Sequence, residues 1–144
     1  MVFSSLTFLL LFLPLTLLLL GATAVAEGLK LTEALMIYED YDGNREDQTV
    51  LDEETLQELQ DMLVRARKNE AQLENCTMNC TLFCTMENGV IYDFAVATDG
   101  CPYITDNSTN QTYRLSDEDD ARLWEIFDIV QEAMGYDAAW VLNW

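Results

Sequence analysis

The most regular pattern of apolar and polar positions in the chain is an alternation from Asn75 to Met86. Cysteine, methionine and leucine occupy every second position from Cys76 onward, and mostly polar residues stand between them. Because side chains of a β-strand point alternately to its two faces, this period of two predicts a strand with one buried face. Asn88-Gly89 follows and favours a two-residue hairpin turn into a return strand over Val90 to Thr98.

Two more short strands are expected after this hairpin. Asp99-Gly100 is a second turn signal that leads into Cys101 to Thr105, and Tyr113 to Leu115 has the composition of a fourth strand. Pro102 cannot donate a backbone hydrogen bond, so its strand should begin there or lie at a sheet edge. Together these segments predict an antiparallel meander of three to four strands.

A helical period appears before the meander, from about Asp52 to Asn69. Thr49 followed by Asp52 resembles a capping box, acids cluster at the start, and basic residues near the end suit the helix dipole. Apolar residues recur at helical spacing on one face: Leu56, Leu59, Met62, Leu63 and Ala66.

A second helix is expected to start at Ser116, whose side chain can cap it with Asp119 at the capping-box position. Its apolar face contains Leu123, Phe127, Val130 and Met134, and Gly135 should end it. The aromatic tail from Tyr136 to Trp144 is expected to dock on the core.

The remaining segments are less regular. Leu29 to Tyr38 fits either a short strand or the first turn of a helix, and Glu39 to Gln48 is interpreted as a loop from its Gly, Asn and charge density. The predicted fold class is therefore α+β: a small single domain with an antiparallel β-meander flanked by two amphipathic helices on one sheet face, stabilised by disulfides.

The N-terminus has the organisation of a secretory signal. An apolar run from Leu6 to Leu20 is followed by Ala24-Val25-Ala26 and then by Glu27. Small residues in an A-x-A step suit signal peptidase, so we expect cleavage after Ala26 and a mature domain over residues 27–144 that is soluble and extracellular. The alternative is that residues 1–26 remain as a membrane anchor.

Four sequons for N-glycosylation, all of the form N-x-Thr, agree with a secretory route. Their asparagines are Asn75, Asn79, Asn107 and Asn110, and each sequon has Thr at its third position. In the first two sequons the middle residue is cysteine, and formation of a disulfide there would compete with glycosylation.

Cys76, Cys80, Cys84 and Cys101 are expected to form disulfides in an oxidising lumen. Residues four apart in a strand are separated by about 13 Å, whereas bridged Cα atoms lie about 4.4 to 6.8 Å apart. Either the chain bends there or the cysteines pair elsewhere, including across a dimer. A two-residue turn places Cys80 nearer to Cys101, which favours that bridge. The spacing also fits a zinc site, which the absence of histidine and the secretory route disfavour.

The charge balance excludes some partners. The chain contains 26 Asp and Glu against 7 Lys and Arg, a net charge of −19, so it repels nucleic acid and anionic membranes and favours a cationic partner. Asp40, Asp42 and Asn44 resemble the start of an EF-hand loop, but Arg45 stands where the turn needs Gly. We expect weak, diffuse binding of divalent cations and no dedicated cofactor.

The chain contains no histidine, which excludes histidine-based triads and acid–base relays. The leading interpretation is a secreted, N-glycosylated, acidic protein without catalytic activity. It would act by extracellular binding or assembly as an effector, an inhibitor or a matrix component. The alternative is a small enzyme or ligand-carrying domain that uses carboxylates or an aromatic-lined pocket.

Overall fold

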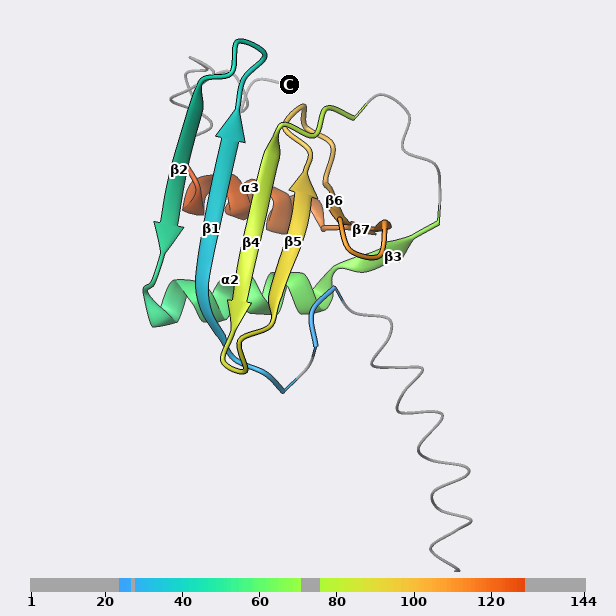
Figure 1. Cartoon of the computed structure of the whole chain (residues 1–144). Helices are drawn as coiled ribbons and strands as arrows, with labels where there is room; N and C mark the ends of the chain where they lie inside the picture. The colour runs from blue at the N-terminus through green and yellow to red at the C-terminus, as the bar shows by residue number, and fades with distance from the viewer. Residues whose placement is uncertain (1–23, 27, 71–75, 129–144) are drawn as a thin grey trace, which may run out of the picture.

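The computed structural model describes residues 24–26, 28–70 and 76–128, which form one antiparallel sheet and two helices (Figure 1). Its seven strands lie in the order β2-β1-β4-β5-β6-β7-β3. The elements are β1 Leu31–Glu39, β2 Arg45–Val50, α2 Glu53–Arg65, β3 Arg67–Asn69, β4 Cys80–Met86, β5 Ile91–Val96, β6 Tyr103–Asp106, β7 Gln111–Arg114 and α3 Asp117–Ile126. The α+β class is confirmed, with more strands than the predicted three or four.

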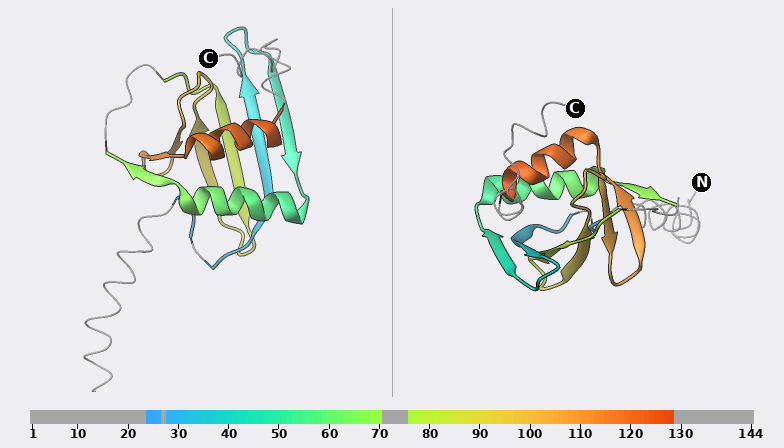
Figure 2. Two further views of the ribbon diagram at one scale, coloured as in Figure 1. Left: turned by 180° about the vertical axis from the view of Figure 1, so that it is seen from behind. Right: turned by 90° about the horizontal axis from the view of Figure 1, so that it is seen from above.

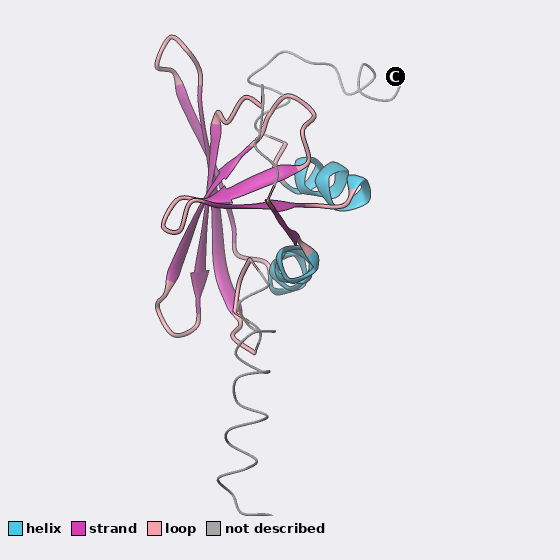
Figure 3. Cartoon of the chain, turned by 90° about the vertical axis from the view of Figure 1, so that its right-hand side faces the viewer, coloured by secondary structure: helices cyan, strands magenta, loops and turns pink. Residues whose placement is uncertain are grey.

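Both helices cover the same face of the sheet, as the sequence indicated (Figure 3). The sheet curves around them, so that α2 and α3 lie in its hollow (Figure 2). We call the face against the helices the inner face and the opposite one the outer face. Because strand residues alternate, each strand contributes side chains to both.

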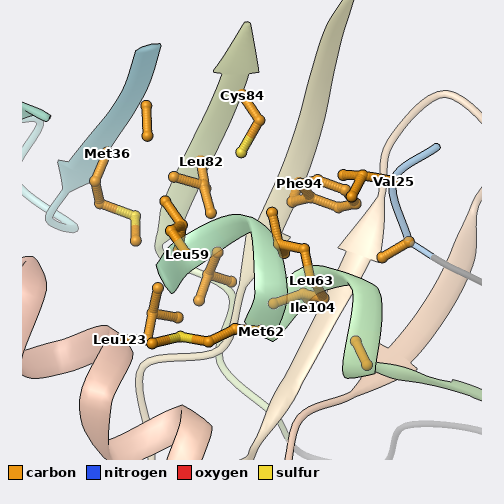
Figure 4. Close-up of a cluster of buried hydrophobic side chains, with 14 of the residues drawn as sticks. Val25, Met36, Leu59, Met62, Leu63, Leu82, Cys84, Phe94, Ile104 and Leu123 are labelled. Carbon is orange, nitrogen blue, oxygen red and sulfur yellow. The ribbon is translucent and has the colours of Figure 1, made fainter. Parts of the chain in front are cut away.

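The core fills the space between the inner face and the helices. Leu59, Met62 and Leu63 of α2 and Leu123 of α3 point toward the sheet (Figure 4). Side chains of the inner face meet them and are fully buried: Met36, Leu82, Cys84, Phe94 and Ile104. Fully burying one large apolar side chain contributes about 1.5 to 3 kcal/mol, so this layer contact dominates the stability of the fold.

Ala24 and Val25, assigned by the sequence to the signal peptide, also lie in the core. Their exposed fractions are 3% and 2%, and Val25 lies near Phe94 (Figure 4). The backbone N–H of Ala26 donates to the Tyr92 hydroxyl at 3.1 Å. Cleavage after Ala26 would remove these contacts, and the cleavage point stays a prediction.

The two helices begin near the expected residues but end earlier. Asp52 itself is the N-cap of α2, accepting from the Thr55 N–H at 2.9 Å, so the capping box starting at Thr49 was wrong. Ser116 caps α3 as predicted. The backbone leaves α2 at Ala66, where ψ is 134°, and α3 ends at Ile126. The helix ends expected at Asn69 and Gly135 are corrected accordingly.

Two edge strands were missed by the sequence interpretation. β2 begins inside the segment interpreted as a loop, Glu39 to Gln48, and continues to Val50, and β3 lies where the first helix was expected to continue. The open choice for Leu29 to Tyr38 is settled as strand β1. The expected docking of the tail from Tyr136 to Trp144 lies outside the described residues.

The β4–β5 hairpin has the expected strands but a different register. Cys80 pairs with Val96 and Cys84 with Tyr92, one residue away from the register of a two-residue turn. The Met86 N–H donates to the Val90 carbonyl at 2.8 Å, which closes a three-residue loop with Gly89 at φ 86°. Glycine at this position is typical of the three-residue hairpin.

Candidate functional site

The β1–β2 hairpin loop contains the three residues proposed for cation binding. Asp40 Oδ1 accepts hydrogen bonds from the N–H groups of Asp42 and Asn44 at 2.9 and 2.8 Å, and its Oδ2 accepts from Asn44 Nδ2 at 2.8 Å. The Asn44 side chain, joined by the backbone donors, holds the pKa of Asp40 below its usual value. This carboxylate already serves an Asx turn. A role in cation binding stays a prediction.

The same hairpin is strongly acidic at its surface. Residues 39–47 contain five acids, Glu39, Asp40, Asp42, Glu46 and Asp47, and one cation, Arg45. Tyr41, at the tip, is 89% exposed. Because the hairpin lies at the sheet edge formed by β2, these carboxylates face solvent and are accessible to a partner.

The described sequons lie at different depths on the surface. Asn107 and Asn110 are exposed in the β6–β7 turn, and Asn110 has φ 57°, a left-handed conformation that asparagine tolerates. Asn107 Nδ2 donates to Asp93 Oδ1 at 2.8 Å. Asn79 is half-buried just before β4, and Asn75 lies outside the described residues. Glycosylation of all four stays a prediction.

The four cysteines divide into a bridge and two thiols. Cys76 is bonded to Cys101, with Cα atoms 6.1 Å apart, so the favoured pairing of Cys80 with Cys101 was wrong. Continued past Cys80 and Val96, the observed β4–β5 register places Cys76 opposite Gly100, next to Cys101. Cys80 and Cys84 are buried thiols on β4, and burial raises the pKa of each to about 12. Such thiols are protonated and unreactive in the folded state.

Asp99 connects the two segments that the bridge joins. Its Oδ2 accepts from the Thr77 N–H at 2.7 Å, and its Oδ1 accepts from the Cys101 N–H at 3.4 Å. A carboxylate oxygen of Asp99 and the two sulfur atoms lie within 4.8 Å of one another. Since the two sulfurs are bonded to each other, this group has a structural role: the disulfide and Asp99 hold the segment around Cys76 against the segment around Cys101.

An open groove of about 400 Å³ lies where β2 leads into α2 and meets the end of α3. Its apolar lining includes Leu51, which is 67% exposed, and Ile126. Its two acids are engaged: Asp52 caps α2, and Glu125 accepts from Arg122 Nη1 at 3.0 Å. Most of the residues that line the groove are polar or charged, but its two carboxylates are held by other partners and do not form a reactive pair.

Two arginines join the helices through carboxylates. Arg65 of α2 binds both oxygens of Asp119, with Nη2 to Oδ1 at 2.8 Å. Arg122 of α3 binds both oxygens of Glu58, at 2.7 and 3.0 Å. The hydrogen bond from Arg122 lowers the pKa of Glu58, whereas burial raises the pKa of Asp120 to about 6.

The outer face of the sheet is a feature that the sequence interpretation missed. Leu35 and Ile37 of β1 and Phe83 of β4 are half-buried there, and Ile91 is 59% exposed. A signal existed in the sequence, because Phe83 stands among the threonines on the solvent side of the alternating segment. This face is more apolar than the charge of the chain suggests.

Within the described residues, neither helix has the length and apolarity needed to cross a membrane. Comparisons with protein-family models, curated proteins and solved structures find no match for the chain.

Proposed function

We propose that this chain is a secreted, N-glycosylated, acidic protein that binds an extracellular partner or joins an extracellular assembly without catalysing a reaction. The observation that carries the proposal is the filled interior. Leu82, Phe94 and Leu123 are buried between the inner face and the helices, in the place where a sheet-and-helix domain would otherwise hold a ligand. The side chains that remain available for function lie on the surface, and this arrangement suits binding to a partner.

The groove at the end of β2 is consistent with this proposal. A glycosidase-type reaction needs two carboxyl groups held across a cleft. Asp52 is committed to the helix cap, and Glu125 is paired with Arg122. Neither carboxylate has the environment of a general acid or a nucleophile, so the groove does not favour the alternative of a small carboxylate enzyme.

The acidic hairpin supports a cationic partner. Residues 39–47 contain five carboxylates and one arginine, and the hairpin that carries them lies at one edge of the sheet. Electrostatic attraction of this kind increases the association rate and weakens as salt is added. A partner with a basic surface or a basic extended segment fits this edge.

Expression in a eukaryotic secretory host tests the route. The protein should appear in the medium, and treatment with N-glycosidase should reduce its apparent mass. Retention inside the cell of an unglycosylated chain that keeps Met1 would contradict secretion and glycosylation together.

Binding to an immobilised Lys/Arg-rich peptide tests the partner class. Glu46→Gln/Asp47→Asn should weaken binding more than Glu54→Gln/Glu118→Gln, because both double variants remove two negative charges but only the first removes them from the hairpin. Equal losses would mean that attraction depends on net charge alone, and no binding by the wild type at low salt would rule out this partner class.

A further inference from the structure

The outer face combines apolar side chains with few charges at its centre. Leu35 pairs across the sheet with Phe83, and Ile37 pairs with Thr81. Thr81 pairs in turn with Ala95. No described helix covers this face, since both helices lie on the inner side (Figure 3). Apolar patches on secreted proteins mark contacts, so the question is what lies over this one.

The strand register leads from this patch to a sequon. Leu35 lies opposite Phe83, and Phe83 lies opposite Asp93. Asn107 then donates two hydrogen bonds to Asp93. The backbone N–H of Asn107 donates to the backbone carbonyl of Asp93 at 2.9 Å, and Asn107 Nδ2 donates to Asp93 Oδ1 at 2.8 Å. Leu35, Phe83, Asp93 and Asn107 therefore form one row across the outer face.

The row places the attachment atom close to the aromatic ring. Asn107 is two strand spacings from Phe83, about 10 Å, a span that the first sugars of an N-glycan can cover. The ring face of Phe83 is electron-rich, and the C–H groups of a sugar ring carry slight positive charge. A sugar lying flat on the outer face therefore gains both apolar contact and an electrostatic attraction.

The hydrogen bond to Asp93 is compatible with glycosylation. The transferase forms a bond between Asn107 Nδ2 and C1 of the lipid-linked sugar, C1 loses its bond to the pyrophosphate leaving group, and one amide hydrogen departs as a proton. The second amide hydrogen remains on Nδ2. Asp93 can therefore keep its hydrogen bond and fix the direction in which the sugar leaves the asparagine.

We propose that the N-glycan of Asn107 lies along the outer face and covers Phe83, with Asp93 as the residue that positions the linkage. This inference rests on the proposed secretory function, because only a chain that enters the lumen acquires the sugar. The glycan would then have a structural role: it would shield the apolar side chains of the row, Leu35 and Phe83, on an otherwise acidic protein.

Asn110 provides the matched control in the same turn. It is exposed, three residues further on, and its backbone N–H donates to the Asp106 carbonyl at 2.7 Å. Its φ of 57° belongs to the turn and not to the strand. A glycan there leaves the protein at the loop and does not follow the row.

The test compares secreted wild type, Asn107→Gln and Asn110→Gly after glycopeptide mass spectrometry has measured the occupancy of each sequon; glycine removes the second sequon and tolerates the positive φ of residue 110. We expect Asn107→Gln to bind a hydrophobic dye several-fold more than wild type and to self-associate, and Asn110→Gly to resemble wild type. Adding Phe83→Thr to Asn107→Gln should reverse the increase in dye binding.

Two variants of Asp93 test positioning separately from occupancy. Asp93→Ala should keep the sugar on Asn107 but increase dye binding, and Asp93→Asn, which retains an acceptor oxygen, should restore the wild-type value. If the two asparagine variants behave alike, or if Asn107 lacks sugar in a secreted chain glycosylated elsewhere, this inference alone is wrong. Dimerisation of the wild type through this face with Asn107 occupied would also overturn it. A chain that is not secreted contradicts the proposed function as well.

Discussion

The two faces of the sheet differ although they are made by the same strands. On the inner face Met36, Leu82 and Phe94 are completely buried under the helices. On the outer face Leu35 and Phe83 are only half-buried. Since Leu82 and Phe83 are neighbours in β4, the difference arises from the layer above each face and not from strand propensity. The inner face determines stability, and the outer face is free for surface contacts.

The largest expected effect compares those two neighbours. Leu82→Ala should lower the free energy of unfolding by about 2 to 5 kcal/mol, because the cavity lies between rigid layers. Phe83→Ala should cost about 1 kcal/mol or less, since the ring is already partly in water. Urea unfolding followed by circular dichroism measures both, and equal losses would contradict the assignment of the two faces.

The cysteines allow the second test. Cys101→Ser removes the bridge to Cys76 and should lower stability by about 2 to 4 kcal/mol. Cys84→Ala changes only packing on the inner face and should cost less than about 1.5 kcal/mol. The native protein should show two thiols that react only after denaturation. Four reactive thiols in the native protein would contradict this.

The buried N-terminal segment around Val25 provides the third test. Loss of Val25 by cleavage after Ala26 should lower the free energy of unfolding by about 1.5 to 3 kcal/mol. Ala22 and Ala24 provide a second A-x-A step two residues before the expected one, and cleavage there keeps Val25. Mass spectrometry of the secreted protein distinguishes Glu27, the expected first residue, from Val25, and a chain that keeps Val25 should be the more stable of the two to urea. A chain that starts at Glu27 and is equally stable to urea would show that this core contact is dispensable.

The contrast between the faces also explains which elements the sequence could predict. β4 was recognisable because Cys80, Leu82 and Cys84 occupy every second position on one buried face, and the residues between them, Phe83 apart, are polar. β2 was not, because its sequence Arg45–Val50 is largely polar and its burial is slight. An edge strand is stabilised by pairing with its neighbour, and that pairing leaves no hydrophobic period in the sequence.

The errors at helix ends and in the hairpin have local causes. Arg67 and Lys68 were interpreted as cations at the end of a helix, but they form the three-residue strand β3 against β7. The bridge partner of Cys101 follows from pairing beyond the strand ends, because the β4–β5 register, continued past Cys80, places Cys76 opposite Gly100 and beside Cys101. Register and long-range pairing depend on tertiary contacts that composition does not encode. The candidate surfaces were correspondingly harder to predict than the fold class.

The pH dependence of stability distinguishes the half-buried Asp120 of α3 from the acids that face solvent. Because burial raises the pKa of Asp120 to about 6, the folded state binds its proton more tightly than the unfolded state. The contribution of this group therefore destabilises the fold as pH rises from about 4 to about 6 and remains unfavourable above that range. Asp120→Asn should increase stability at pH 7 by about 1 to 3 kcal/mol and change little at pH 3.

Chemical denaturation over this pH range checks the prediction. Glu118→Gln removes one charge from the exposed side of the same helix turn and serves as the control. If both variants gain the same stability at pH 7, the effect comes from reduced net charge and not from the burial of Asp120.

The smallest effect concerns divalent cations at the acidic hairpin. Calcium and magnesium should stabilise the protein to a similar extent and only at about millimolar concentration, because they screen a surface of scattered carboxylates. Asp42→Ala should leave this response nearly unchanged, because the ions act on the whole acidic surface. Asp40, which would be the first ligand of a calcium loop, already accepts three hydrogen bonds within its own turn. Thermal unfolding with each ion measures the response. A calcium-selective increase in melting temperature at micromolar concentration, abolished by Asp42→Ala, would instead show a built calcium site and would make the hairpin a metal-dependent binding surface.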